Sequence, residues 1–138
     1  MNVFLDTSVL LDVLARREPF YSDSAEVWTL AERGQVRGFI STLSIANLSY
    51  LLRREASPKA ARKALSVLQD IFGLVPLDAR IIDHAIDSAM DDFEDAIQFF
   101  SAIRAGADIL ITRNGDDFPD ADMAIQTPAE FLATHFPR

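Results

Sequence analysis

The stretch that decides the fold of this chain is Val3-Phe4-Leu5-Asp6-Thr7-Ser8-Val9-Leu10-Leu11. Three apolar residues typical of a buried strand end at a carboxylate, Asp6, and an apolar helical pattern begins directly after it. Thr7 or Ser8 is predicted to cap that helix. Asp6 is therefore expected at the carboxyl end of a buried strand, the edge at which open α/β sheets bind their ligands. An acid there, with two hydroxyls beside it, is typical of a site for a hard cation.

The composition is that of one ordinary domain. The 138 residues fit a single domain over residues 1–138, and 49% of them are hydrophobic, which is enough for a buried core. The chain has no cysteine, which excludes disulfides, zinc–thiolate sites and cysteine nucleophiles. No apolar stretch reaches the roughly 20 residues that span a bilayer, and no secretory signal is visible. We therefore expect a cytoplasmic protein that does not enter a membrane.

Charge is distributed unevenly along the chain. The net charge of −8 argues against sequence-independent coating of DNA. Between Asp91 and Asp122 there are nine acids and two arginines. A second segment gathers five bases around a single acid: Arg53, Arg54, Lys59, Arg62 and Lys63, with Glu55. An acidic pole with a basic flank fits a cation site beside a polyanion, and it fits a basic protein partner equally well; the basic segment is also consistent with a solvated surface.

Short apolar strands alternate with helices along the whole chain. Strands are predicted at residues 2–5, 38–41, 74–77, 109–112 and 123–126. Helices are predicted at residues 7–16, 19–33, 43–52, from Ser57-Pro58 onward, at 79–90, at 93–105 and from Thr127 onward. The last of these opens with a capping box formed by Thr127 and Glu130. This alternation predicts an α/β fold of three layers, α/β/α, with a mostly parallel central sheet.

An acidic run precedes the helix predicted at residues 93–105. Asp91 with Glu94 would form a capping box. A polar stripe on this helix is expected to face water: Glu94, Gln98 and Ser101. Asp95 lies four residues before Phe99 and is therefore expected to point toward the sheet. The alternative is that Asp95 is a second capping carboxylate, stabilised by the helix dipole.

Two further polar residues follow the apolar strand at residues 109–112. Asn114 is expected to emerge at the same sheet edge as Asp6, although a turn asparagine in a left-handed conformation before Gly115 is an equally good interpretation. Asp117 is either a metal ligand or a carboxylate that hydrogen-bonds the loop backbone.

Two polar residues also interrupt apolar helices. Asn47 lies in a very apolar helix and needs hydrogen-bond partners if it is buried, so it either stabilises a loop or faces the mouth of the site. Asp12 lies almost two turns beyond Asp6 and is predicted to be a surface residue.

Four segments in order resemble the PIN domain family, and within it the VapC-like toxin nucleases of toxin–antitoxin pairs. The segments that carry the resemblance are Val3–Ser8, Ile40–Leu48, Asp95-Ala96 and Ile111–Phe118. The family usually has glutamate where this chain has Asn47, and aspartate where it has Asn114. A branch of the family with asparagine at both places is similar to this chain, and it shares the run Asp92–Ala96.

The resemblance implies a metal-dependent endoribonuclease that hydrolyses RNA phosphodiester bonds with Mg²⁺ or Mn²⁺. It assigns four catalytic residues, of which the first three hold the metal: Asp6, Asp95, Asn114 and Asp117. It assigns four supporting or substrate-binding residues: Thr7, Ser8, Asn47 and Arg113. Because two amides replace two carboxylates, we expect one weakly held ion rather than a tight pair, with a preference for Mn²⁺.

The same resemblance implies partners. A toxin of this kind is expected to bind a small antitoxin protein with a basic segment that reaches the acidic mouth. A homodimer through the apolar helix near Leu48–Leu52 is also expected, unless that face belongs to the core.

Two other functions compete with the nuclease. A catalytically weak or inactive PIN-like module that binds RNA or a protein is favoured by Asn47 and Asn114. A haloacid-dehalogenase-type phosphatase needs a second aspartate two residues after the first, where this chain has Ser8.

Overall fold

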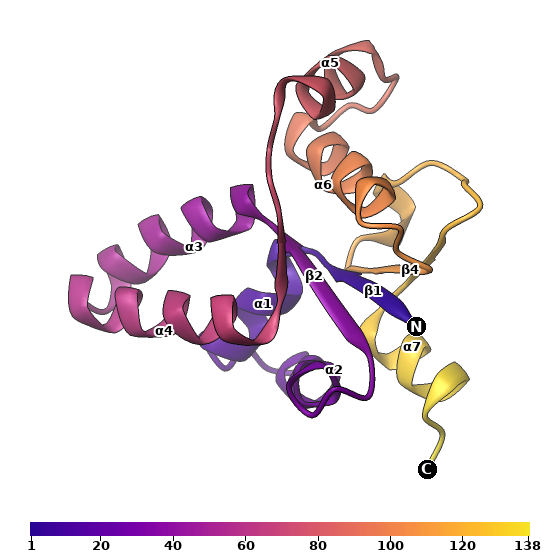
Figure 1. Ribbon diagram of the computed structural model, residues 1–138. Coiled ribbons are helices and arrows are strands. Elements are labelled where there is room, and N and C mark those ends of the chain that lie inside the picture. The colour runs from indigo at the N-terminus through magenta and orange to yellow at the C-terminus, as the bar shows by residue number, and fades with distance from the viewer.

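A parallel sheet of five strands forms the centre of the computed structural model, which describes residues 1–138 (Figure 1). The strands are β1 (Asn2–Leu5), β2 (Arg37–Ser41), β3 (Gly73–Val75), β4 (Ile109–Ile111) and β5 (Ala124–Gln126). Their order across the sheet is β3-β2-β1-β4-β5, and every neighbouring pair is parallel. The prediction of a mostly parallel sheet is confirmed.

Helices cover both faces of this sheet. They are α1 (Thr7–Leu14), α2 (Tyr21–Glu32), α3 (Thr42–Glu55), α4 (Pro58–Ile71), α5 (Ala79–Asp87), α6 (Phe93–Arg104) and α7 (Pro128–His135), with a 3₁₀ turn at Gly115–Asp117. The helices α1, α2, α3, α4 and α7 pack into one apolar cluster, whereas α5 and α6 pack into another on the opposite face. The predicted three-layer α/β/α architecture is therefore confirmed. All seven helices fall short of the length and hydrophobicity required of a bilayer-spanning segment.

The alternation of side chains along β1 explains why there are two clusters. Val3 and Leu5 belong to the cluster with α1 and α2, and Phe4 belongs to the cluster with α5 and α6. All three side chains are completely buried, as expected for a strand with helices on both faces. The neighbouring strand repeats the pattern, since Leu110 of β4 joins Phe4.

The position of β1 in the sheet creates the functional edge. The chain builds β2 and β3 on one side of β1 and then β4 and β5 on the other, so the strand order reverses beside β1. At such a reversal the following connections diverge and leave a crevice at the carboxyl ends of the strands. Asp6 follows β1 at this edge and Thr112 follows β4. The Asp6 N–H donates to the carbonyl of Ile111 over 3.0 Å, which holds the two strand ends together.

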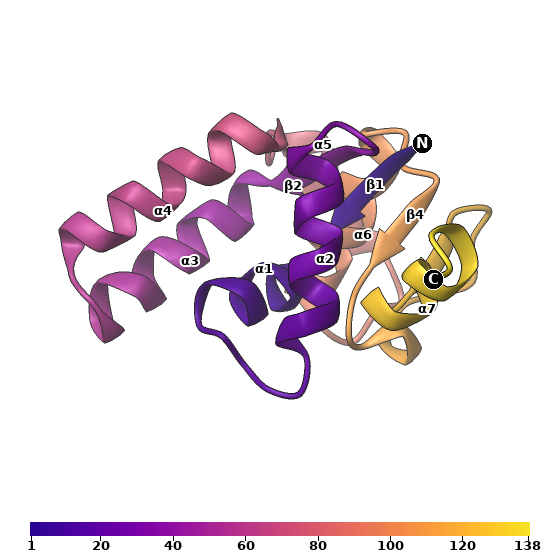
Figure 2. The same cartoon turned by 90° about the horizontal axis from the view of Figure 1, so that it is seen from below.

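The helices α3 and α4 form an antiparallel hairpin that projects from the rest of the domain (Figures 1 and 2). Leu48 is fully buried in the main cluster, and Leu51 and Leu52 are partly buried against it. Much of the apolar face near Leu48–Leu52 is therefore core. Tyr50 is the large side chain of this stretch that remains exposed.

The predicted helix and strand boundaries agree with the structure to within a few residues, but two predicted helix caps are wrong. Asp6 itself, rather than Thr7 or Ser8, caps α1 by accepting the N–H of Thr7. Asp92 rather than Asp91 caps α6. Thr7 and Ser8 are already inside α1, and Asp91 lies one residue before the N-cap of α6, so in both places the aspartate in extended backbone directly before the helix is the cap.

Candidate metal-binding and catalytic site

Asp6 is held in one orientation by hydrogen bonds to both carboxylate oxygens. Its Oδ1 accepts the backbone N–H of Thr7 at 2.8 Å and the side-chain amide of Gln98 at 3.3 Å. Its Oδ2 accepts the hydroxyl of Thr112 at 2.8 Å and that of Ser8 at 3.4 Å. The residue is only 6% exposed. A carboxylate fixed in this way is preorganised to bind a ligand at the sheet edge.

A chain of polar side chains ties the helices on both faces to this carboxylate. The Gln98 amide lies 2.8 Å from Thr7 Oγ1 and 2.8 Å from Ser44 Oγ. Thr7 and Ser44 share a hydrogen bond of 2.6 Å, and the Ser41 hydroxyl donates to Ser44 over 3.2 Å. Thr7, predicted as a substrate contact, therefore has its hydroxyl within the protein's own network.

Gln98 and Ser44 were missed by sequence reasoning. Gln98 was predicted to face water with Ser101, and this prediction is wrong, because they are 2% and 0% exposed. The helix α6 packs on the sheet and also against α5, so its buried face is wider than one stripe. A signal was present in the sequence, because Gln98 follows Asp95 by three residues and so lies on the same side of the helix.

Asp95 lies in the first turn of α6 and is partly buried. The pKa of Asp95 is raised to about 6. Burial is the largest cause, and the negative charges of nearby carboxylates add to it: Asp92, Asp6, Asp117 and Glu94. The carboxylates of Asp6 and Asp117 are thus close enough to destabilise the charged form of Asp95. Asp95 is not the N-cap of α6, since that position is held by Asp92, whose Oδ1 accepts the Asp95 N–H at 3.0 Å; a favourable interaction of Asp95 with the helix dipole stays open.

Asn114 and Asp117 stand on the loop after β4. Asn114 has φ −116° and ψ 50°, so it is not the left-handed turn residue of the alternative interpretation. Its backbone N–H donates to Thr112 Oγ1 over 3.1 Å, and its side chain is exposed and makes no hydrogen bond. Asp117 is also exposed, and its N–H donates to the carbonyl of Asn114 over 3.0 Å. Both side chains are free to accept a ligand.

Asn47 does not join the hydrogen-bond network around Asp6. It is partly buried on α3, one turn after Ser44, and its side chain makes no hydrogen bond. Ser44 is the residue of α3 that reaches the network. The supporting role of Asn47 stays a prediction.

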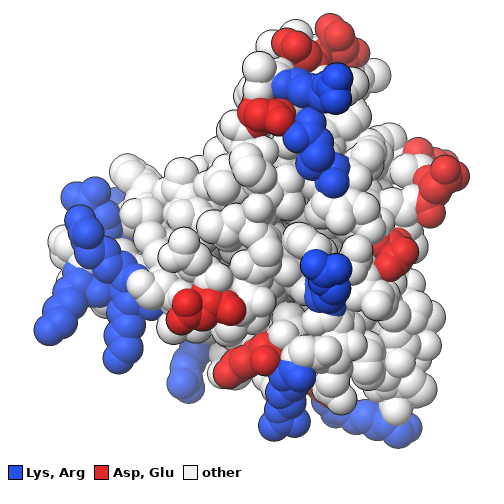
Figure 3. Space-filling model, in the orientation of Figure 1, with Lys and Arg blue, Asp and Glu red and all other residues white.

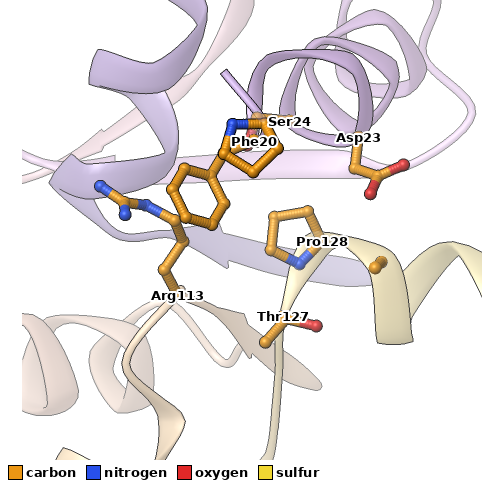
Figure 4. Close-up of a pocket in the computed structure, with 8 residues that line it drawn as sticks. Phe20, Asp23, Ser24, Arg113, Thr127 and Pro128 are labelled. Carbon is orange, nitrogen blue, oxygen red and sulfur yellow. The ribbon is translucent and has the colours of Figure 1, made fainter. Parts of the chain in front are cut away.

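Asp12 was predicted to be a surface residue, and this is wrong, because its side chain is fully buried. Arg113 pairs with it, with Nε 2.8 Å from Asp12 Oδ2. The guanidinium carbon of Arg113 lies 4.2 Å from the centre of the Phe20 ring, and the two side chains face each other in Figure 4. Burial raises the pKa of Asp12, an effect that the positive charges of Arg113 and Arg17 oppose. Arg113 therefore has a structural partner inside the protein, while its side chain stays 24% exposed toward the loop.

The donor set fits a hydrated cation better than a closed metal cage. No group of three or more acidic or histidine side chains lies close enough to hold a metal ion by itself. Asp6, Asp95 and Asp117 nevertheless crowd their negative charges, and none of them has a basic partner. Mg²⁺ keeps several of its waters and commonly binds through one or two carboxylates. A cation of this kind would offset the burial and the neighbouring negative charges that together raise the pKa of Asp95.

Comparison with known proteins identifies the family. The family model described as PIN domain matches residues 2–116. The chain belongs to the PIN domain family. The match begins at β1 and ends one residue before Asp117. A search of curated proteins found no match.

Two solved structures share the fold of this PIN domain. VapBC2 from Rickettsia felis, bound to a DNA fragment from its promoter, has a TM-score of 0.67 at 15% identity over 92% of this chain and 98% of that one. VapC20 from Mycobacterium tuberculosis, a toxin that cleaves the sarcin–ricin loop, has a TM-score of 0.66 at 18% identity over 83% of this chain and 92% of that one. At these identities the likeness establishes the fold.

Proposed function

We propose that this PIN domain is a metal-dependent endoribonuclease that hydrolyses RNA phosphodiester bonds and is the toxin of a toxin–antitoxin pair. One observation carries the proposal. Asp6 is fixed at the strand reversal, and its negative charge is one of those that raise the pKa of Asp95, which supports a shared site. The likeness in fold to VapC20, described as a toxin that cleaves the sarcin–ricin loop, supports RNA as the substrate.

In this proposal the side chains divide into metal ligands and residues that orient them. Asp6 and Asp95 hold Mg²⁺ or Mn²⁺, and Asn114 contributes its carbonyl oxygen. When bound, such an ion would supply an acidified water and would neutralise charge at the scissile phosphate. Asp117 positions the reacting groups from the loop after β4. Gln98 and Thr112 keep Asp6 in its orientation through their hydrogen bonds.

Four residues complete the site. Ser8 and the exposed part of Arg113 contact the substrate phosphate, Thr7 aligns the site through its bond to Ser44, and Asn47 supports α3. The small number of carboxylates favours one ion of modest affinity over two tightly bound ions.

Cleavage assays with purified protein test this assignment. The wild type is expected to cleave RNA with Mn²⁺ or Mg²⁺ and to lose activity with a chelator. Asp6→Asn and Asp95→Asn are each expected to abolish cleavage while the circular dichroism spectrum is unchanged. Asp91→Asn is a matched control, because it removes one exposed carboxylate beside the same helix and leaves the network intact. Cleavage that survives both Asp6→Asn and Asp95→Asn removes the assignment.

A second candidate is a catalytically weak or inactive PIN-like module that binds RNA or a protein. The specific observation in its favour is the lack of a cluster of three acidic side chains, which goes with Asn47 and Asn114 at usual acidic positions. A folded protein that is inert with Mn²⁺ but still binds RNA or a protein would establish this reading over the nuclease.

We also propose the partners of a cytoplasmic toxin. The unpaired carboxylates Asp95 and Asp117 favour a small antitoxin whose basic segment covers the site. A lysine- and arginine-rich antitoxin peptide should inhibit cleavage, and less so at high salt. A homodimer remains part of the proposal, and light scattering of the purified protein would test it.

A further inference from the structure

Five basic residues lie near the free end of the α3–α4 hairpin, and Figure 3 shows basic side chains gathered at its outer tip. We call this surface the basic tip: Arg53, Arg54, Lys59, Arg62 and Lys63. All five residues are exposed, and none of them takes part in an ion pair. Mutual repulsion of such a group is unfavourable for folding, and it is most notable in a chain whose net charge is −8.

The helix dipoles do not account for the basic tip. Arg53 and Arg54 lie in the last turn of α3, where positive charge is stabilised. Lys59 lies in the first turn of α4, where positive charge is destabilised, and Arg62 and Lys63 follow it within the next turn. The first turn of α4 contains no acidic residue to offset them. Lys59 is therefore placed against the preference of its helix, and Arg62 and Lys63 gain nothing from the dipole.

An exposed aromatic ring accompanies these charges. Tyr50 is 64% exposed and lies one turn before Arg53 and Arg54 on α3. The guanidinium carbon of Arg54 is 5.9 Å from the centre of its ring. Together with Pro58, these residues line a shallow hollow of about 310 Å³. Positive charge next to an exposed ring is the combination that holds single-stranded nucleic acid, because the charges track the backbone and the ring stacks on a base.

The helix α3 links this surface to the candidate catalytic site. Ser44, in its first turn, belongs to the network around Asp6, and Arg53 lies nine residues later in the same helix. At 1.5 Å per residue the two ends are about 14 Å apart. A few nucleotides of a single strand are enough to cover that distance. The carboxylates at the site repel a polyanion, so attraction must come from elsewhere on the surface.

We propose that the basic tip is the docking surface for a single-stranded segment of the RNA substrate, a few nucleotides from the bond that is cleaved. Arg53, Arg54, Lys59, Arg62 and Lys63 bind its phosphates, and Tyr50 stacks on one base. The inference rests on the proposed function for the identity of the polyanion. It adds to that function a binding surface outside the catalytic site.

Fluorescence anisotropy with a labelled 12-nucleotide RNA tests the proposal, in a chelator so that binding is measured without cleavage. The variant Arg62→Gln with Lys63→Gln removes two proposed phosphate contacts. The slope of log K against log salt is expected to fall by about 1.4, which is about a 25-fold loss of affinity at 0.1 M salt. Tyr50→Ala is expected to weaken binding about tenfold, whereas Tyr50→Phe keeps the affinity because it keeps the ring.

The matched control is Arg33→Gln with Arg37→Gln, which removes the same charge near the start of β2, at the opposite edge of the sheet. Its salt slope is expected to equal that of the wild type. Equal losses in both double variants, or no loss in either, would overturn the proposal. Lys59→Glu separates binding from folding. It is expected to weaken RNA binding and yet to raise the melting temperature, because negative charge is favoured in the first turn of a helix, so its loss of binding cannot come from misfolding.

Failure of this inference differs from failure of the proposed function. RNA binding that depends on the basic tip, without any cleavage in Mn²⁺, supports the docking surface and removes the nuclease. Cleavage with a KM that is unchanged by Arg62→Gln and Lys63→Gln overturns the docking surface and retains the nuclease. Tip-dependent binding of poly-glutamate with no binding of RNA assigns the surface to an acidic protein and overturns the proposal.

Discussion

Replacement of Asp95 by asparagine is expected to stabilise the metal-free protein while it abolishes RNA cleavage. Burial and four neighbouring carboxylates raise the pKa of Asp95 from 3.8 to about 6. The ionised side chain is therefore unfavourable in the folded protein at neutral pH. Asparagine has a similar shape and no charge, so it removes the repulsion together with the proposed metal ligand.

The size of the stabilisation follows from the shift in pKa. About 2 pKa units correspond to about 3 kcal/mol at most, at about 1.4 kcal/mol for each unit. Asp95 is partly exposed, so solvent screening reduces this to about 1–2 kcal/mol. With an unfolding entropy of about 2.1 cal/mol/K per residue over 138 residues, the melting temperature should rise by about 3–7 °C.

The pH dependence has a definite sign. Between pH 3.8 and about 6 the unfolded chain releases the Asp95 proton while the folded protein retains it. The free energy of unfolding of the wild type therefore falls as pH rises through this window, relative to Asp95→Asn. The two proteins should be nearly equal in stability below pH 4, and the full difference should be present by pH 7.

The difference in the free energy of unfolding is measured by urea unfolding of the metal-free proteins from pH 3.5 to 7.5. Cleavage is assayed separately in Mn²⁺. Asp91→Asn is the control, because it removes an exposed carboxylate just before the same helix that is not among the charges raising the pKa of Asp95. A loss of stability in Asp95→Asn at pH 7, or a difference that does not change between pH 4 and 7, would show that the carboxylates do not crowd one another. Retained cleavage would refute the proposed metal ligand.

Three further predictions concern the site and its support. Thr112→Val removes the 2.8 Å hydrogen bond to Asp6 and is expected to lower kcat about 10- to 100-fold with the fold intact, whereas Thr112→Ser retains it. Arg113→Ala leaves buried Asp12 unpaired and should lower the free energy of unfolding by about 3 kcal/mol in urea, with partial recovery when Asp12→Asn is added; independent effects in this double-mutant cycle would contradict the pairing. Mn²⁺ at about 100 times its Kd should raise the free energy of unfolding by about 2.7 kcal/mol in the wild type and not in Asp6→Asn, and calorimetry that finds two tight Mg²⁺ sites would contradict a single weak one.

Local sequence patterns were sufficient to predict the architecture. The period of the apolar residues, the proline and glycine punctuation and the capping box at Thr127 act over a few residues, so they can be read without knowledge of the packing. The same locality placed Asp6 at the end of β1 and Asn114 after β4, because a strand that is apolar throughout must end where polar residues begin.

Tertiary packing decided which side chains surround those positions. Asp6 meets Thr112, 106 residues away, and Gln98, 92 residues away, and no local pattern specifies such pairs. Gln98 was assigned to the solvent because one helix alone does not show that α6 is covered by both the sheet and α5. Asp12 was assigned to the surface for the same reason, since its partner Arg113 is distant in the sequence. The sequence by itself determined the elements and the edge where ligands bind, whereas the contacts that make this edge a site depend on how α3, α6 and β4 pack around β1.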